Sequence, residues 1–287
     1  MTESQGGYYL PEPSHWPLVG SIALFLMLGG FAMFLHGGSS LTMIIGAAVL
    51  IVMLFGWFGT VVSESQSGKY NDQVDMSFRL GMGWFIFSEV MFFAAFFGVL
   101  FYARMYSVPW LGGAGNNFDT NALLWPDFIA DWPSNGPENV GGDFALMGAW
   151  GIPAVNTLVL LTSGVTVTWA HWGLKENKRG QLILGLVATV ALGFLFLGLQ
   201  AEEYIHAYQE LNLTLKSGIY GTTFFMLTGF HGLHVTLGAT MLTVILIRCI
   251  KGHFTADNHF AFEAVTWYWH FVDVVWLGLF VFVYWLV

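Results

Sequence analysis

Residues 79–106 read RLGMGWFIFSEVMFFAAFFGVLFYARMY, and this stretch decides the fold. It is apolar almost throughout, and at about 1.5 Å per helical residue it is long enough to cross a hydrocarbon core of roughly 30 Å. Its one carboxylate, Glu89, lies ten residues beyond Arg79 and therefore near the bilayer centre. An ionised carboxylate is costly there, so Glu89 is expected to face protein, to carry a proton or to have a partner.

Two interpretations of Glu89 stay open at this point. Ionisable groups inside a membrane mark functional sites by default, which favours a functional carboxylate. The alternative is a structural glutamate that is hydrogen-bonded to a neighbouring helix and has no wider role. Residues 79–106 alone do not separate the two.

The composition is that of an integral membrane protein. Of the 287 residues, 56% are hydrophobic and 9% are charged, whereas water-soluble domains carry roughly 25% charged residues. The nine Lys and Arg are scattered and the net charge is −9, so no partner of the nucleic-acid class is expected. The single Cys249 excludes an intrachain disulfide and a multi-cysteine metal cluster.

Seven apolar segments predict an all-α, polytopic membrane protein with seven transmembrane helices. The segments cover residues 16–35, 41–62, 79–106, 153–172, 182–201, 219–250 and 262–287. The N-terminus lacks the basic-then-apolar order of a cleaved signal peptide. The expected organisation is an N-terminal inner segment, helices one and two, an inner loop, and helices three to seven, at residues 1–15, 16–62, 63–77 and 78–287 respectively.

One long polar break interrupts the apolar segments, at residues 107–144. It contains four prolines, and Trp110, Trp125 and Trp132 suit a membrane interface, so we expect an ordered surface loop. A disordered linker would hold fewer aromatic residues. The loop has no Lys or Arg but five acids, which are Asp119, Asp127, Asp131, Glu138 and Asp143.

The basic residues set the expected orientation. One side of the membrane receives seven of them, which are Lys69, Arg79, Lys175, Lys178, Arg179, Arg248 and Lys251. The other side receives only Arg104 and Lys216. By the positive-inside rule the richer side is the cytoplasm or matrix, so the N-terminus is inside. Seven spans then place the C-terminus and the long loop outside.

Two pairs of polar residues occur at helical spacing within the apolar segments. His231 and His234 share a helix face in GFHGLH, as do His270 and Asp273 in WYWHFVDVVW. A haem or copper site is one interpretation. The favoured one is that they hydrogen-bond helices together or contact a lipid head group. The chain has no adjacent His-His pair and no Cys/His/Met set typical of copper, so no metal is expected.

A Glu-x-x-His motif occurs at Glu203 and His206, with the spacing of di-iron helical bundles. A di-iron site needs a second such motif, which this sequence lacks. We therefore interpret the pair as a helix terminus at the outer interface. The Ser and Thr residues of the later spans have no His–Asp set for nucleophilic catalysis and are expected to hydrogen-bond between helices.

Six runs together closely resemble subunit III of the aa3-type haem–copper cytochrome c oxidases. They are SHWPLVGS at 14–21, FRLGMGWFIFSEVMFF at 78–93, NTLVLLTSGVTVTWAHW at 156–172, LQAEEY at 199–204, YGTTFFMLTGFHGLHVTLG at 220–238 and FEAVTWYWHFVDVVWL at 262–277. The resemblance covers nearly the whole chain apart from the long loop, and the runs occur in the family's order.

The resemblance implies a fold in which helices 1–2 and 3–7 are separated by a cleft that holds phospholipids. It identifies Glu89 as the family's buried functional carboxylate. It also makes four residues candidates for lining the lipid cleft, namely Trp57, Glu64, Arg79 and His231. His234, His270 and Asp273 are then polar groups of helix packing. Ser63 stands where some relatives carry Arg, which removes one lipid-phosphate contact.

The function implied is that of a structural and regulatory subunit without a catalytic centre. Such a subunit stabilises subunit I and supports proton uptake and sustained reduction of O₂ coupled to proton pumping. Haem a and copper are expected in the partner subunits I and II, and phospholipid is expected to bind this chain. Cytochrome c is an indirect partner, and the acids of the long loop are a hypothetical weak steering field for it.

Two rival functions remain as alternatives. Quinol oxidases have a related subunit III, which usually lacks the first two helices present here. A stand-alone transporter using Glu89 and Asp273 would call for charged groups along a path and often internal repeats, and we see neither. The long outer loop exceeds that of mitochondrial relatives, so a multi-pass protein of the bacterial inner (cell) membrane is expected.

Overall fold

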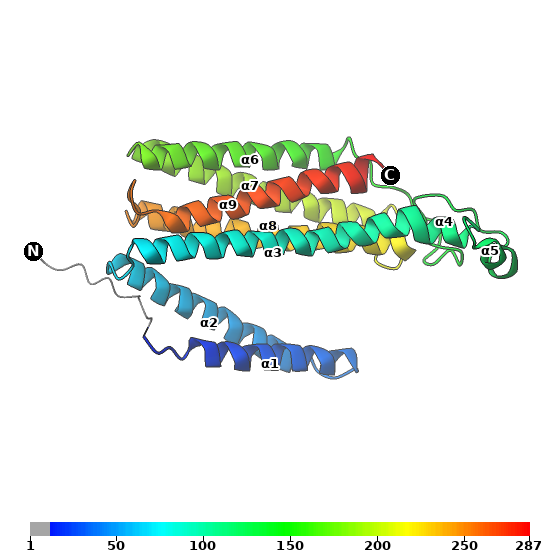
Figure 1. The fold of residues 1–287 in the computed structure, drawn as a ribbon, viewed down its shortest axis with the longest axis horizontal. Helices are drawn as coiled ribbons and strands as arrows, with labels where there is room; N and C mark the ends of the chain where they lie inside the picture. Colours follow the sequence, from blue (N-terminus) through cyan, green and yellow to red (C-terminus); the bar gives the residue numbers. More distant parts are fainter. Residues whose placement is uncertain (1–11) are drawn as a thin grey trace, which may run out of the picture. The chain divides into compact units, whose positions relative to one another are not determined.

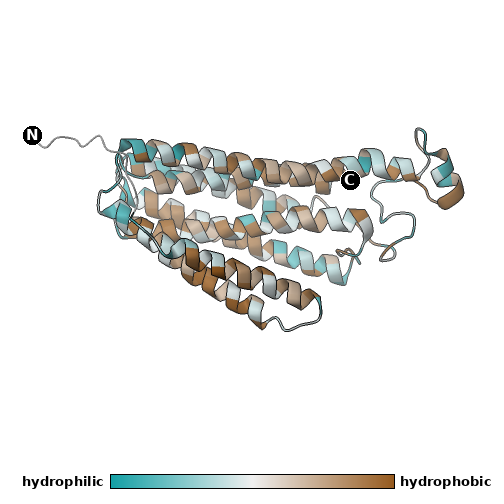
Figure 2. Cartoon of the chain, turned by 60° about the horizontal axis from the view of Figure 1, so that its bottom comes forward, coloured by the Kyte–Doolittle hydropathy of each residue, from teal (hydrophilic) through white to brown (hydrophobic). Residues whose placement is uncertain are grey.

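The computed structural model describes residues 12–287, which form an all-helical protein. Seven helices in this range are long and apolar enough to cross a membrane, which confirms the predicted fold class (Figure 1). Most of the expected N-terminal inner segment, residues 1–11, lies outside the described residues. Figure 2 shows apolar residues along the helices and hydrophilic ones gathered at helix ends and loops.

The helices follow one another with short connections except in one place. The membrane-spanning helices are α1 (Trp16–Leu35), α2 (Leu41–Gln66), α3 (Asp72–Tyr102), α6 (Ile152–Lys175), α7 (Arg179–Gln209), α8 (Gly218–Ile250) and α9 (Phe260–Leu279). Two π-helical turns, η1 (Ala103–Ser107) and η2 (Phe280–Trp285), extend α3 and α9. The long loop before α6 contains α4 (Val108–Leu111) and α5 (Phe118–Leu124).

Several helices are longer than the apolar segments that predicted them. The loop expected at residues 63–77 is largely helical, because α2 runs to Gln66 and α3 begins at Asp72. Likewise α7 continues to Gln209, two turns beyond the expected end at residue 201. Bilayer thickness sets the length of the apolar part of a span, and the helix can continue beyond it with polar residues. Asp72 and Asp75 in the first turn of α3 also favour an early start, because carboxylates stabilise a helix N-terminus.

The chain divides into two compact units, Met1–Leu80 and Gly81–Val287. In the first unit, α1 and α2 approach closely at two glycines. A Cβ atom on Gly30 would lie 2.3 Å from the backbone nitrogen of Met43, and one on Gly46 would lie 2.3 Å from that of Met27. Small residues at such crossings let membrane helices pack backbone to backbone.

The second unit has an aromatic core built around two tryptophans of α9. Trp269 and Trp276 are fully buried. Trp269 Nε1 donates to Ser163 Oγ at 2.8 Å, and Trp276 Nε1 donates to Thr157 Oγ1 at 2.9 Å. Both acceptors lie on α6. Each indole therefore buries its ring in the core and satisfies its one donor, as a buried tryptophan requires.

Candidate functional site

The carboxylate singled out by the sequence is joined to a histidine of another helix. Glu89 Oε2 on α3 lies 2.8 Å from His234 Nε2 on α8, across 145 residues of sequence. Both side chains are largely buried, with 21% of Glu89 and 11% of His234 exposed. Glu89 therefore has the partner that a carboxylate in a membrane interior requires.

The hydrogen bonds of His234 fix how many protons this pair holds. Its Nδ1 lies 2.6 Å from the carbonyl oxygen of Phe230, and because a carbonyl can only accept, Nδ1 carries a hydrogen. The contact between Nε2 and Glu89 needs one further hydrogen, either on an imidazolium or on a carboxylic acid. In both forms the pair is neutral as a whole. Charge neutrality lowers the cost of placing a carboxylate in an apolar medium.

Aromatic rings surround the Glu89–His234 pair. The centroid of Phe93 lies 5.0 Å from that of His234, and the centroid of Phe92 lies 5.8 Å from it. Tyr268 of α9 stacks on the imidazole at 6.3 Å and donates its hydroxyl to the backbone oxygen of His234 at 3.4 Å. These rings shield the pair from solvent. The hydrogen bond between Glu89 and His234 is stronger there than it would be in water, because the local dielectric constant is lower.

A second histidine–carboxylate pair joins α9 to α6. His270 Nδ1 lies 3.3 Å from Asp273 Oδ2, and its Nε2 lies 3.1 Å from Thr168 Oγ1. The Thr168 hydroxyl donates to Gly164 O at 2.9 Å, so its oxygen accepts from His270 Nε2. One hydrogen is again shared between imidazole and carboxyl. A Cβ atom on Gly164 would lie 2.4 Å from Asp273 Oδ2, so this glycine makes room for the carboxyl.

His231 is turned away from the Glu89–His234 pair although it shares a helix face with His234. Its Nε2 donates to the backbone oxygen of Val272 on α9 at 3.2 Å, and the side chain is fully buried. Phe196 and Trp276 pack against its ring at centroid distances of 5.6 and 5.0 Å. The described neighbours of this lipid-cleft candidate are thus protein atoms inside the second unit.

The other three lipid-cleft candidates lie in the first unit. Trp57 on α2 is 45% exposed. Glu64 accepts a hydrogen bond from the hydroxyl of Tyr70 at 2.9 Å, and Arg79 Nε donates to Asp75 Oδ2 at 2.7 Å. Glu64 and Arg79 therefore lie near the junction of α2 and α3, each with a protein partner.

Glu203 lies within α7 and not at the helix terminus that the motif suggested. It is fully buried in the second unit, where Tyr284 of η2 donates its hydroxyl to Oε1 at 2.5 Å. His206, three residues on, is instead paired with Glu210 at 3.1 Å. The interpretation of the motif as a helix terminus was wrong for Glu203, because α7 continues to Gln209. The sequence around Glu203 does not indicate this contact, because Tyr284 lies 81 residues away along the chain.

No group of three or more His, Cys, Asp or Glu side chains that could hold a metal ion occurs among residues 12–287. The histidines considered as ligands each have another use. His231 binds a backbone oxygen, His234 binds Glu89, and His270 binds Thr168 and Asp273. In the described structure these histidines therefore serve as hydrogen-bonding groups that join or brace helices.

Comparison with known proteins gives one consistent family. The family model described as cytochrome c oxidase subunit III matches residues 6–124 and 129–287. Cytochrome c oxidase subunit 3 of Gadus morhua is 41% identical over 286 residues, which cover 99% of this chain and 99% of the relative. The same protein of Dugong dugon is also 41% identical over 99% of both chains. That of Lemur catta is 40% identical over 99% of this chain and 94% of its own length.

The carboxylate chemistry of the site can be tested by chemical labelling. A hydrophobic carbodiimide reacts with a protonated carboxyl in an apolar phase, so it should modify Glu89 in preference to the exposed acids. Glu89→Gln keeps the side-chain shape and should assemble normally but lose the label, as read by mass spectrometry. Glu138→Gln, at an exposed position of the long loop before α6, is the matched control. Labelling that persists in Glu89→Gln and disappears in Glu203→Gln would show that the reactive carboxyl is Glu203.

Proposed function

This chain belongs to the cytochrome c oxidase subunit III family, and from that premise we propose that it is the oxidase's non-catalytic structural subunit, with no redox centre of its own. The use of His231, His234 and His270 in hydrogen bonds between or within helices supports the proposal. Haem a and copper then belong to the partner subunits I and II. Electrons from cytochrome c reach O₂ without passing through this chain.

The proposed contribution is to cover subunit I in the membrane and to keep proton uptake effective through many turnovers. Large apolar side chains are exposed along α3, among them Trp84, Phe87 and Met91. In a membrane such residues face either lipid or a neighbouring subunit. Glu89 of α3 and His234 of α8 form a neutral, hydrogen-bonded pair that joins these two helices. We propose that this pair supports proton delivery by maintaining the arrangement of α3 on the bundle.

Bound phospholipid is the second part of the proposal. We assign Trp57, Glu64 and Arg79 to contacts with a lipid head group and its upper acyl chain. Support comes from the half-exposed indole of Trp57 and from the guanidinium of Arg79, which suits a phosphate. The fully buried His231 is better explained as a helix-joining residue, because Val272 and aromatic rings surround it.

The two rival functions are less favoured. The matching relatives are cytochrome c oxidase subunits, and the chain has both of the helices that quinol oxidase relatives usually lack. A proton-coupled transporter using Glu89 and Asp273 would need these groups on a common path. The two carboxylates are instead paired to different histidines, His234 and His270.

We further propose a multi-pass protein of the bacterial cell membrane with its N-terminus in the cytoplasm and its C-terminus outside. The positive-inside asymmetry supports the orientation. The long outer loop supports the bacterial assignment, and the family match is interrupted within this loop at residues 125–128. The relatives compared above are animal proteins, so this assignment depends on the loop and not on them.

Removal of the chain tests the division of labour. The remaining oxidase should keep its haem spectrum and its initial rate of O₂ reduction, because no haem ligand is lost. Activity should then decline progressively over turnover, and proton delivery should slow at higher pH. Loss of a haem band on removal would make His231, His234 or His270 a ligand. Full activity with an undiminished turnover lifetime would contradict the proposed support of catalysis.

The orientation can be tested with accessible tags. A tag at the N-terminus or between Lys175 and Arg179 should react only from the cytoplasmic side. A tag within residues 112–131 or at the C-terminus should react only from the outside. Because seven spans place the two ends on opposite faces, reactivity of both ends from one side would disprove the proposed topology.

A further inference from the structure

The outer loop contains a lobe, residues 112–139, whose surface combines apolar side chains, acids and a hollow. We propose that this lobe is a docking surface for the water-exposed part of another subunit of the oxidase. A lysine or arginine of that subunit would enter the hollow between Asp127 and Asp131, with apolar side chains against Leu123 and Ile129. This inference rests on the proposed function, since it assumes that the chain is part of the oxidase complex.

The lobe extends beyond the helix ends of the second unit (Figure 1). In Figure 1, α5 lies beyond the ends of α8 and α9, and Figure 2 shows the same projection from a second direction. Yet Leu123 is 78% exposed and Ile129 is 75% exposed. Phe118 and Leu124, close to them in the sequence, are exposed as well. Several large apolar side chains exposed on one short segment favour a protein–protein contact over a free surface.

The lobe is held in one shape, so it presents this surface without having to fold on binding. Asn121 Nδ2 donates to the backbone oxygens of Leu111, Trp125 and Phe128, at 3.3, 2.7 and 3.4 Å. At its far end, Ser134 O accepts from the backbone nitrogen of Tyr220 on α8 at 3.2 Å. A preformed surface binds more tightly because less conformational entropy is lost.

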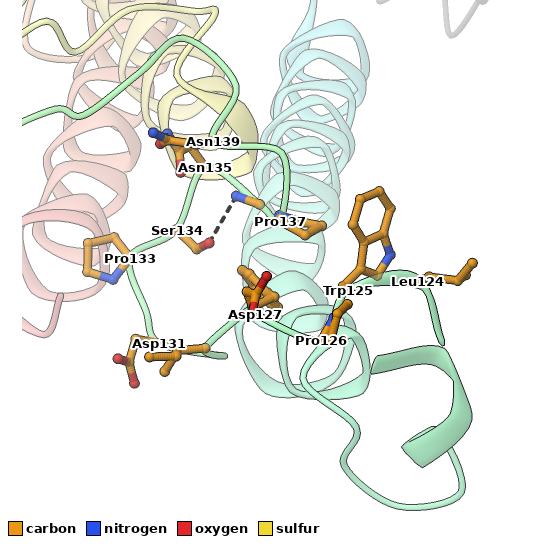
Figure 3. A pocket seen from close by; sticks show the side chains of 13 residues that line it. Leu124, Trp125, Pro126, Asp127, Asp131, Pro133, Ser134, Asn135, Pro137 and Asn139 are labelled. Atoms are coloured by element: carbon orange, nitrogen blue, oxygen red, sulfur yellow. Dashed lines mark hydrogen bonds between the residues drawn. The ribbon is translucent and has the colours of Figure 1, made fainter. Parts of the chain in front are cut away.

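The hollow is large enough for one long side chain. Its volume is about 470 Å³, and its lining residues, all between Leu124 and Asn139, include Asp127 and Asp131 but not Glu138. Figure 3 shows these two acids on separate parts of its wall. The backbone nitrogen of Gly136 donates to Ser134 Oγ at 2.9 Å in another part of the wall. Pro126, Pro133 and Pro137 stiffen the wall. An acid-lined hollow with rigid walls suits a cationic side chain that extends from a partner.

Charge complementarity identifies the partner chemistry. The outer loop has five acids and neither Lys nor Arg. Within the described part of the chain, no Lys or Arg forms an ion pair with Asp119, Asp127 or Asp131. A mobile basic protein that is only steered to the membrane would need these charges alone. The exposed Leu123 and Ile129 favour a lasting contact, because permanent interfaces are the more apolar ones.

Site-specific crosslinking in the purified, haem-containing complex tests this docking surface. A photoreactive phenylalanine analogue at position 123 or 129 should crosslink to another subunit, at a peptide that contains Lys or Arg. The paired substitutions Asp127→Asn and Asp131→Asn should lower the yield about fivefold, the loss expected for two exposed ion pairs. Glu138→Gln removes an acid that does not line the hollow and should leave the yield unchanged. The same analogue at Phe25, exposed on α1, is the control for reaction with lipid.

Three results would overturn the inference. The first is reaction of the analogue with lipid or detergent only. The second, with cytochrome c added to the complex, is crosslinking to cytochrome c and to no other subunit. The third is a crosslinking yield that Asp127→Asn with Asp131→Asn does not change. Failure of the proposed function has a separate signature. In that case the chain would purify without haem before any crosslinking is attempted.

Discussion

The hydrogen bond between Glu89 and His234 is the constraint that links α3 to α8 within the second unit. It joins the middle of α3 to α8 at 2.8 Å, in surroundings of aromatic rings. A carboxylate in hydrocarbon is tolerated only with a partner, and a histidine in hydrocarbon likewise needs its ring nitrogens satisfied. The bond to Phe230 O leaves one shared hydrogen between the two side chains. The pair is therefore neutral, and it commits α3 to one position against α8.

The same constraint explains the other buried acids of this unit. Asp273 shares a hydrogen with His270, whose other nitrogen is satisfied by Thr168. Glu203 accepts from Tyr284. These contacts tie α9 to α6 and the end of α9 to α7, while the indoles of Trp269 and Trp276 add two further bonds to α6. Buried polar groups thus specify which helices meet, while apolar packing supplies most of the contact area.

The sequence predicted the fold class and singled out Glu89 as a carboxylate in need of a partner, because hydropathy and one carboxylate in an apolar span are local signals. It did not predict the partner of Glu89. His231 and His234 have equivalent spacing on α8, yet one turns to Val272 and the other to Glu89, since α9 and α3 approach that face at different places. Glu203 was misplaced for a similar reason. Its burial depends on where α7 ends and on a tyrosine of η2, and neither follows from local pattern.

A double-mutant cycle on Glu89 and His234 tests the central claim most directly. Unfolding free energies would be measured in detergent micelles for Glu89→Leu, His234→Leu and the double variant. Each single change leaves a buried polar partner unsatisfied and should cost about 2 kcal/mol. The double variant should cost no more than one single change, because replacing both partners with apolar groups leaves no orphan. Strict additivity of the two single effects would contradict the account, since it would mean that the two side chains do not interact.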